Sequence, residues 1–474
     1  MSTTAVRPQV SVRTPRIFSR RYSRYLLFGL CSGLYLLPFM RLLAQGGGGD
    51  QGILIDGAVR ILHGQVFARD FFEVVGPGTF YWVALFFKVF GVSFFVSRVC
   101  LFLTSLGTAL SIYYLSGRVC RRYQALPSLL VFGTYFSGLW PTISHHVDSN
   151  FFALLSVTFI VLWRNSGKRA LLLSAGALAG VTTCFLQPKG MLLLLALSIW
   201  FYIQYRRRSA PLSALGLVMV SYCSFIGLVL VYFWTCHALW DLVYANFVWP
   251  FTHYSAVNVV PYAQGIISDY WNVFAVAKSR FSWTIVTAAV LITPFLFVAA
   301  LPALLPAMAA RFRKSVTEPA VSLYWLCGSA LWISEFHHKD MTHLAFGSPL
   351  LIILCVYYLE QYRTKIADLA LQAVAICAAC LLAFNFFLVL SARSAMTRVG
   401  PVAMFKSNPA LASLQDKVAP GEEIFAYPYI PIYYFLSATT NPTRYSAMMY
   451  HFNTPSQFEE VVRVLDHRRV RYVL

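Results

Sequence analysis

The chain has 474 residues, of which 58% are hydrophobic and 12% are charged. A soluble domain carries about 25% charged residues, so this composition excludes an ordinary soluble protein, and the repeated apolar runs predict an α-helical polytopic membrane protein. The net charge of +20 would suit nucleic acid only if the basic residues formed one patch, and they are instead divided among short loops between apolar runs.

Eleven apolar runs of a length suited to membrane spanning follow one another along the chain. They are preceded by a basic N-terminus, residues 1–24, with six Arg and no acid, which we expect in the cytoplasm. Together they predict a transmembrane region at 25–390. The runs cover residues 25–40, 93–115, 123–140, 147–163, 170–185, 190–205, 212–236, 283–304, 320–333, 344–358 and 369–390.

The apolar segment GTFYWVALFFKVFG, in the first predicted outer loop at 45–92, is too short for a span. As a helix it would extend about 21 Å, against a hydrocarbon core of about 30 Å. We therefore expect a helix at 78–90 that lies in the interface or re-enters the membrane. With this segment left out of the count, every Arg-rich loop falls on one side, which the positive-inside rule makes cytoplasmic.

The opposite side of the membrane holds nine of the twelve acids, and all eight His, that precede the C-terminal region. These residues gather in short loops and in the second predicted outer loop at 237–282, which indicates a working face. Outer loops need some polar residues in any membrane protein, so a purely structural role stays open. The residues are Asp50, Asp56, Asp70, Glu73, Asp148, Asp241, Asp269, Glu335 and Asp340, with His63, His145, His146, His237, His253, His337, His338 and His343.

The composition changes after residue 390. Residues 391–474 contain turn residues, a short strand pattern in EEIFAYP, an amphipathic helix pattern at 456–465 and a strand pattern in VRYVL. An odd number of spans places this segment on the side opposite the N-terminus. We predict a small extracytoplasmic α/β region.

Asp50 follows the first predicted span, beyond a four-glycine run that lets the backbone turn sharply. A carboxylate at the membrane surface, partly shielded from water, can act as general base toward a hydroxyl. Asp70 and Glu73 are one helical turn apart, before the breaker sequence VVGPG. For Asp56 and Glu73 the simpler interpretation is that they cap short interfacial helices, whereas for Asp50 we expect a function.

The first outer loop carries an acid after the first span, followed by GPGTFYW and VFGVSFFVSR. Later segments of note are HHVDSNFFALLSVTFIVLW, FLQPKGMLLLLAL and HKDMTHLAFGSPLLIIL. These motifs resemble those of the membrane-embedded GT-C glycosyltransferases, most closely the protein O-mannosyltransferases and the aminoarabinose and lipopolysaccharide sugar transferases. The resemblance covers roughly residues 25–390. Members often have Asp-Glu where this chain has Asp50-Gln51, and an aromatic residue where Leu344 follows His343.

The resemblance implies GT-C-like architecture and inverting transfer of a sugar from a polyprenyl-phosphate donor to an acceptor hydroxyl. This chemistry needs a base for the acceptor proton and cations for the leaving phosphate. On this interpretation Asp50 is the base, and Asp148 orients the acceptor or pairs with Lys189. Lys189 neutralises the donor phosphate, with Arg98 and Lys339 as alternatives. The structural alternative for Arg98 is snorkelling toward lipid headgroups.

The other polar residues of the outer loops are predicted to contact the donor phosphate or the sugar hydroxyls, or to line the rim. His and Asp also suit Zn²⁺ or Mn²⁺, but their spacing matches no closed metal site. We therefore assign no metal ligand and no required cofactor, and keep a divalent metal as an alternative. The predicted substrate-binding residues are Asp56, Asp70, His337, His338, Asp340 and His343.

These inferences predict a glycosyltransferase of the inner membrane whose active site faces the periplasm or the cell exterior. The donor is a polyprenyl-phosphate hexose or pentose, the acceptor is a lipid, a glycan or a protein hydroxyl, and nucleic acid is not a partner. The alternative is a non-catalytic lipid or sugar transporter or flippase. Transporters place charges in mid-span along a pathway, and the predicted span centres carry almost none.

The predicted topology can be tested with reporter fusions. A fusion after Leu115 should report the cytoplasm and a fusion after Leu390 the outer side, because only that register puts all the Arg clusters on one side. If both fusions reported the same side, the eleven-span topology would be wrong.

Overall fold

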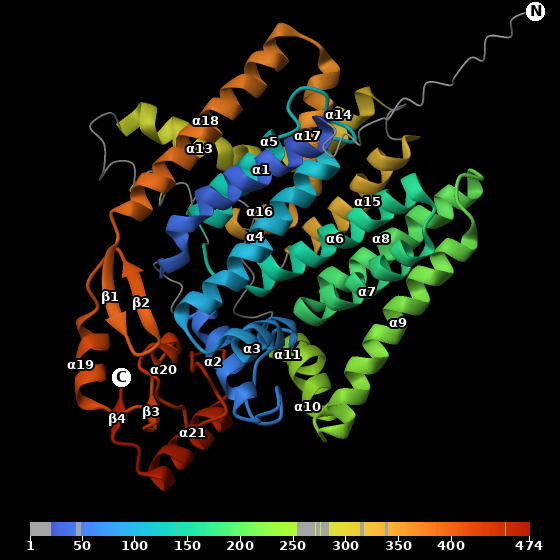
Figure 1. Ribbon diagram of the computed structural model, residues 1–474. Coiled ribbons are helices and arrows are strands. Elements are labelled where there is room, and N and C mark those ends of the chain that lie inside the picture. Colours follow the sequence, from blue (N-terminus) through green and yellow to red (C-terminus); the bar gives the residue numbers. More distant parts are fainter. Residues whose placement is uncertain are drawn as a thin grey trace, which may run out of the picture.

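The computed structural model describes residues 20–43, 49–139, 141–253, 271, 275, 284–312, 317–336, 340–450 and 452–474. Most of these residues are helical. Figure 1 shows long helices packed side by side, with a small region containing β-strands at one end.

The helices of the first half begin with α1 and end with α11. Their bounds are α1 (Arg20–Leu36), η1 (Leu37–Arg41), α2 (Asp50–Leu62), α3 (Gly78–Phe90), α4 (Phe94–Ser116), α5 (Leu126–Val131), η2 (Phe132–Leu139), α6 (His145–Ser166), α7 (Arg169–Phe185), α8 (Gln187–Arg206), α9 (Leu212–Thr235), α10 (Leu239–Val243), η3 (Tyr244–Val248) and α11 (Trp249–His253).

The second half adds further helices and four short strands. Their bounds are α13 (Thr284–Ala299), η5 (Leu301–Leu304), α14 (Leu305–Arg311), α15 (Pro319–Ile333), α16 (Met341–Gly347), α17 (Pro349–Tyr362), α18 (Lys365–Leu390), β1 (Arg393–Thr397), β2 (Gly400–Met404), α19 (Pro409–Lys417), β3 (Ile424–Phe425), α20 (Ile432–Leu436), α21 (Pro455–Arg468) and β4 (Tyr472–Val473).

The multi-span membrane class is confirmed. Among the described residues five helices are long and apolar enough to cross a membrane, or up to seven if each of two bent pairs is one span. The helices α3, α7 and α15 are apolar but shorter. The count of about eleven spans therefore stays a prediction. A helix is present where the interfacial helix was expected, since α3 covers Gly78–Phe90.

The late apolar run at 344–358 is not one straight helix as predicted. It is divided between α16 and α17, which meet at an angle of 78°. Pro349 begins α17, and a proline has no amide hydrogen with which to continue the hydrogen-bond ladder of the preceding helix. The break turns α16 away from the axis of α17 and so places His343 near the first turn of α6, where its ring meets that of His146.

Two large hydrophobic cores hold the described chain together. The first lies among α4, α6, α7, α8, α15 and α17 and contains fully buried side chains such as Leu154, Trp200 and Tyr324. The second joins α2 and α3 to the C-terminal region, for example through the stacked rings of Phe87 and Phe435 at 5.7 Å. The outer loop and the C-terminal region therefore pack as one body.

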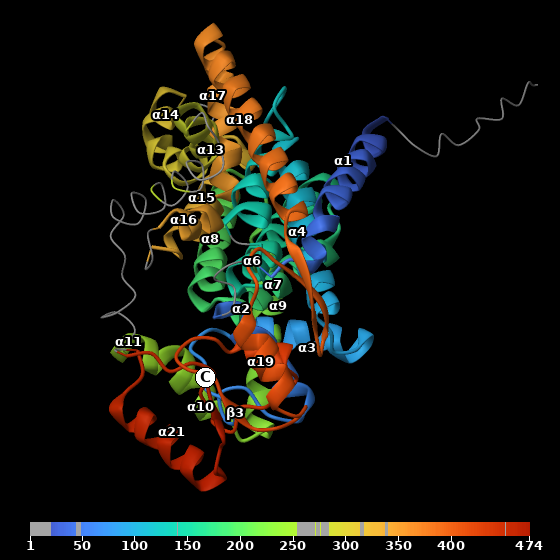
Figure 2. The same cartoon turned by 90° about the vertical axis from the view of Figure 1, so that its left-hand side faces the viewer.

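The described residues after 390 carry short helices and strands and lie beside α2 and α3 (Figures 1 and 2). The strands β1 and β2 pair antiparallel, with Arg393 opposite Met404, and β3 and β4 pair parallel, with Ile424 opposite Tyr472. The predicted strand in EEIFAYP corresponds to β3, and the predicted helix at 456–465 lies within α21.

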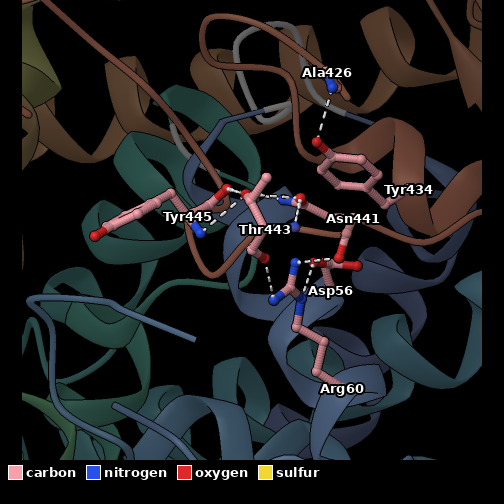
Figure 3. A network of polar contacts seen from close by, with 7 residues as sticks. All are labelled: Asp56, Arg60, Ala426, Tyr434, Asn441, Thr443 and Tyr445. Atoms are coloured by element: carbon pink, nitrogen blue, oxygen red, sulfur yellow. Dashed lines mark hydrogen bonds and ion pairs between the residues drawn. The ribbon is translucent and has the colours of Figure 1, made fainter. Parts of the chain in front are cut away.

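A buried polar network fastens α2 to this region (Figure 3). Arg60 Nε donates to Asp56 Oδ2 at 3.0 Å, and the guanidinium also donates to the carbonyl oxygens of Thr443 at 3.0 Å and Asn441 at 3.3 Å. Because both charged side chains are buried, each needs the other as a partner. The network thus sets the position of α2, the helix that begins with Asp50.

Candidate active site

A polar cavity lies between α2, α6, α16, the chain segment 72–75 and the C-terminal region. Its volume is about 330 Å³. The acids and histidines that line it are Asp50, Glu73, His145, His146 and His343, and its lining also includes Phe72, Tyr429, Tyr445, Phe452 and Asn453. The residues come from distant parts of the sequence, so the cavity exists only in the folded chain.

Asp50 is the first residue of α2 and is partly buried. The positive end of the helix dipole favours a carboxylate at this position. The hydroxyl of Tyr429, from the C-terminal region, donates a hydrogen bond to Asp50 Oδ1. The predicted base therefore faces the cavity, with one oxygen held by the C-terminal region.

Two of the cavity histidines belong to the first turn of α6. Ser144 caps this helix, since its hydroxyl oxygen accepts from the amide of His146 at 3.2 Å, and His145 and His146 therefore enter the cavity from a fixed helix end. The ring of His343 stands perpendicular to that of His146, with centroids 4.8 Å apart.

Asp340 positions the third histidine. Its carboxylate caps α16 by accepting from the amide of His343 at 2.8 Å, and its other oxygen is 2.7 Å from His343 Nδ1. Asp340 and His343 were each predicted to bind substrate; His343 lines the cavity, whereas Asp340 contacts His343 and is not part of the cavity lining. His337, His338 and Lys339, also predicted site residues, lie outside the described part of the chain.

Behind the histidines is a buried charged network. Lys189 Nζ lies 2.5 Å from Glu335 Oε1, and the second Glu335 oxygen is 2.9 Å from Nδ1 of His146. Lys189 also donates to the side-chain oxygen of Asn150 at 2.9 Å. Both Lys189 and Glu335 are fully buried, so Lys189 lies behind the cavity wall and does not line it.

Asp148 and Arg98 are also buried away from the cavity lining. Asp148 Oδ2 accepts from the hydroxyl of Thr79 at 3.0 Å, which links α6 to the start of α3. Arg98 donates to the carbonyl oxygens of Pro141 at 3.0 Å and of Leu42. Its guanidinium is therefore used inside the protein and does not reach toward headgroups. Asp148 does not pair with Lys189.

The two remaining predicted acids also serve local contacts. Asp56 forms the buried pair with Arg60 described above. Asp70 accepts from Arg69 at 2.7 Å and from the amide of Val66 at 2.7 Å. The hydrogen bond from Arg69 lowers the pKa of the Asp70 carboxyl. Neither acid lines the cavity.

Sequence reasoning missed several residues of the cavity and its support. Glu73 was interpreted as a helix cap, yet it lines the cavity, and burial raises its pKa to about 8. Glu335 carried a weak signal, an acid at the end of an apolar run. Tyr429 lies 379 residues from Asp50 in the chain, and no pattern in the sequence indicated that the two residues meet.

The described side chains can also be compared with what a metal site requires. Among the described residues no group of three or more His, Cys, Asp or Glu is arranged to hold a metal ion. The side chains that are brought together can accept and donate protons and hydrogen-bond a phosphate or a sugar.

The structure also has an apolar groove. It lies among α3, α6, α7 and α9, has a volume of about 720 Å³ and is lined mainly by aromatic and aliphatic side chains, among them Trp82, Phe152, Phe185, Leu228 and Phe233. The chain segment 72–78 connects the two sites, because residues 72–75 line the cavity and residues 77 and 78 line the groove.

Comparison with known proteins places the fold. No family model and no curated protein sequence matches the chain. Among solved structures it resembles ArnT from Cupriavidus metallidurans bound to undecaprenyl phosphate, with a TM-score of 0.58 and 13% identity over 95% of this chain and 89% of that chain. The apo state of ArnT from the same organism has a TM-score of 0.57 and 13% identity over 95% of this chain and 90% of that chain. These likenesses show that the chain shares the fold of ArnT, in line with the resemblance of its motifs to aminoarabinose transferases.

A third solved structure, the arabinosyltransferase EmbB from Mycobacterium smegmatis, has a TM-score of 0.38 and 12% identity over 80% of this chain and 42% of that chain. This likeness is too low to support an argument.

The buried pair of Lys189 and Glu335 can be tested by a double-mutant cycle. Glu335→Gln leaves a buried ammonium without its counter-charge and should destabilise the protein by about 3–5 kcal/mol. Lys189→Met should cost a comparable amount. The double variant should recover most of the loss, because neither buried charge is then left alone. The readout is thermal unfolding of the purified protein in detergent. Additive losses in the double variant would show that the two side chains do not interact.

Proposed function

We propose that this chain is an inverting glycosyltransferase that moves a sugar from a polyprenyl-phosphate donor to an acceptor hydroxyl at the outer face of the inner membrane. The observation that carries the proposal is the position of Asp50 in a polar cavity whose lining residues 72–75 are followed closely in the chain by residues 77 and 78 of an apolar groove. A lipid-linked sugar likewise has a polar part, the sugar and its phosphate, and an apolar part, the lipid chain. The ArnT structure of the same fold is bound to undecaprenyl phosphate, which supports this class of donor.

The donor lies across both sites in this proposal. Its prenyl chain occupies the groove among α3, α6, α7 and α9, where aromatic walls replace lipid neighbours. Its phosphate and sugar reach past the segment 72–78 into the cavity. Asp148 has an indirect role here, because its bond to Thr79 fixes the start of α3, the helix that forms one wall of the groove.

The chemical step requires a base on the acceptor side. The acceptor oxygen attacks the anomeric carbon, the bond from that carbon to the phosphate oxygen breaks, and the bonding electrons leave with the phosphate. The proton of the hydroxyl passes to Asp50, whose Oδ1 is held by Tyr429 and whose Oδ2 faces the acceptor. Attack opposite the leaving group inverts the anomeric centre. Loss of a general base costs about 10²–10⁴ fold in rate.

The leaving phosphate requires hydrogen-bond donors or cations. We assign this role to His145, His146 and His343, since all three line the cavity. Lys339, four residues before His343 in the chain, stays a further proposed ligand of the phosphate. Lys189 acts indirectly, by holding the Glu335 carboxylate against His146.

Glu73 has a separate role in substrate binding. With a pKa of about 8, its carboxyl is mainly protonated at neutral pH and can donate a hydrogen bond to a sugar hydroxyl. A neutral acid also avoids repelling the donor phosphate. As the pH rises through 8 this carboxyl ionises, which opposes binding of the anionic donor.

The C-terminal region is part of the proposed active site. It supplies Tyr429, Tyr445 and Asn453 to the cavity, so it can contact the acceptor directly. On the predicted topology this region and the cavity face the periplasm. The acceptor is then a lipid, a glycan or a protein hydroxyl on that side of the membrane.

The proposal predicts separate effects for two acids of the first outer loop. Asp50→Asn keeps the shape of the side chain and removes the base, so sugar transfer from a purified polyprenyl-phosphate donor should fall by about 10²–10⁴ fold, while donor binding persists. The matched control is Asp70→Asn, which makes the same chemical change outside the cavity and should transfer at close to the wild-type rate.

Transfer by Asp50→Asn at the wild-type rate would remove Asp50 from the mechanism. A wild-type protein that moves the donor across the membrane without forming a glycosidic bond would instead support the transporter alternative.

A further inference from the structure

A second polar cleft lies far from the proposed active site. It is formed between the loop after α4, residues 117–125, and the turn that joins α17 to α18. Figure 1 shows this turn at the top of the molecule, opposite the strands of the C-terminal region. The cleft has a volume of about 430 Å³. Its charged lining consists of Arg121, Arg122, Arg363 and Lys365 with Glu360 and Asp368, so four positive and two negative groups leave a formal charge of +2.

One of the two acids, Glu360, accepts hydrogen bonds from backbone amides. The carboxylate of Glu360 accepts hydrogen bonds from the amides of Arg121 at 2.7 Å, Arg122 at 3.0 Å and Tyr123 at 2.8 Å. These bonds fix the loop against the end of α17. The carboxylate therefore serves the loop that carries two of the basic side chains, and these side chains project from an ordered backbone.

The other acid is shared by two partners. Asp368 accepts from the hydroxyl of Tyr123 at 3.0 Å and lies 3.4 Å from the guanidinium of Arg122. No ion pair within the described residues involves Arg121, Arg363 or Lys365. Three like charges in one cleft repel one another, and an anion placed between them would remove that repulsion.

The surface next to the cleft is apolar. On α18, which begins at Lys365, the side chain of Ile366 is 81% exposed and that of Leu369 is 62% exposed. These positions face outward from the helix bundle. A ligand with a phosphate at the cleft and hydrocarbon chains along α18 would match both features, whereas a water-soluble anion would match only the first.

We propose that this cleft binds the phosphate headgroup of an anionic phospholipid in the cytoplasmic leaflet. Arg121, Arg363 and Lys365 contact the phosphate, and the acyl chains follow the exposed face of α18. The positive-inside rule places this end of the molecule in the cytoplasm, where the leaflet carries anionic lipids. The proposal does not depend on the glycosyl-transfer proposal, because it uses the opposite end of the molecule.

The test measures binding of short-chain phosphatidylglycerol to the purified full chain by native mass spectrometry. The wild type should bind one molecule more tightly than it binds short-chain phosphatidylcholine. The triple variant Arg121→Gln, Arg363→Gln and Lys365→Gln should bind it about tenfold or more weakly, since each basic group contributes to attraction for an anionic lipid. The control is Arg169→Gln, Arg206→Gln and Arg208→Gln, which removes the same charge from other basic positions outside the cleft.

Three results would overturn the proposal. The control variant could lose as much affinity as the cleft variant, which would indicate general attraction to a basic surface. Phosphatidylcholine could bind as tightly as phosphatidylglycerol. Inorganic phosphate could compete fully at equal concentration, which would indicate a site for a free anion. If the triple variant fails to fold, Arg363→Gln alone should still weaken phosphatidylglycerol binding, and unchanged binding in that variant would contradict the proposal.

Discussion

The contact between Lys189 and Glu335 is the constraint on which the site depends. Two opposite charges lie 2.5 Å apart with no exposure to solvent, where an unpaired charge would cost several kcal/mol. The pair therefore holds α8 against the end of α15. Because Glu335 also contacts His146, the same pair fixes one wall of the cavity. The histidine is then held on a rigid element, which suits the phosphate-binding role that we propose for it.

A second constraint comes from the C-terminal region. The network of Asp56 and Arg60 fastens it to α2, and Tyr429 contacts Asp50 at the first turn of the same helix. The proposed base is therefore bounded on one side by the helix bundle and on the other by the C-terminal region. Tyr429 therefore depends on the packing of the C-terminal region for its contact with Asp50.

Much of this arrangement could be predicted from the sequence, because it depends on local patterns. Apolar runs indicated the membrane class, and motifs around Asp50 and His343 indicated the fold and two residues that line the cavity. The contacts of Lys189, Arg98 and Asp148 could not be predicted, since a cation or acid at a helix end looks the same whether it meets a ligand or a buried partner. Only the fold shows that all three are buried.

We propose that a polyprenyl phosphate lies with its phosphate in the cavity and its chain in the apolar groove. Photo-crosslinking with a polyprenyl phosphate that carries a photoreactive group near the phosphate, followed by peptide mass spectrometry, can test this position. We expect crosslinks to the segment 72–78 and to residues 445–453, and their loss when excess unlabelled polyprenyl phosphate is added. Crosslinks confined to other helices, or crosslinks that the competitor does not reduce, would contradict the proposal.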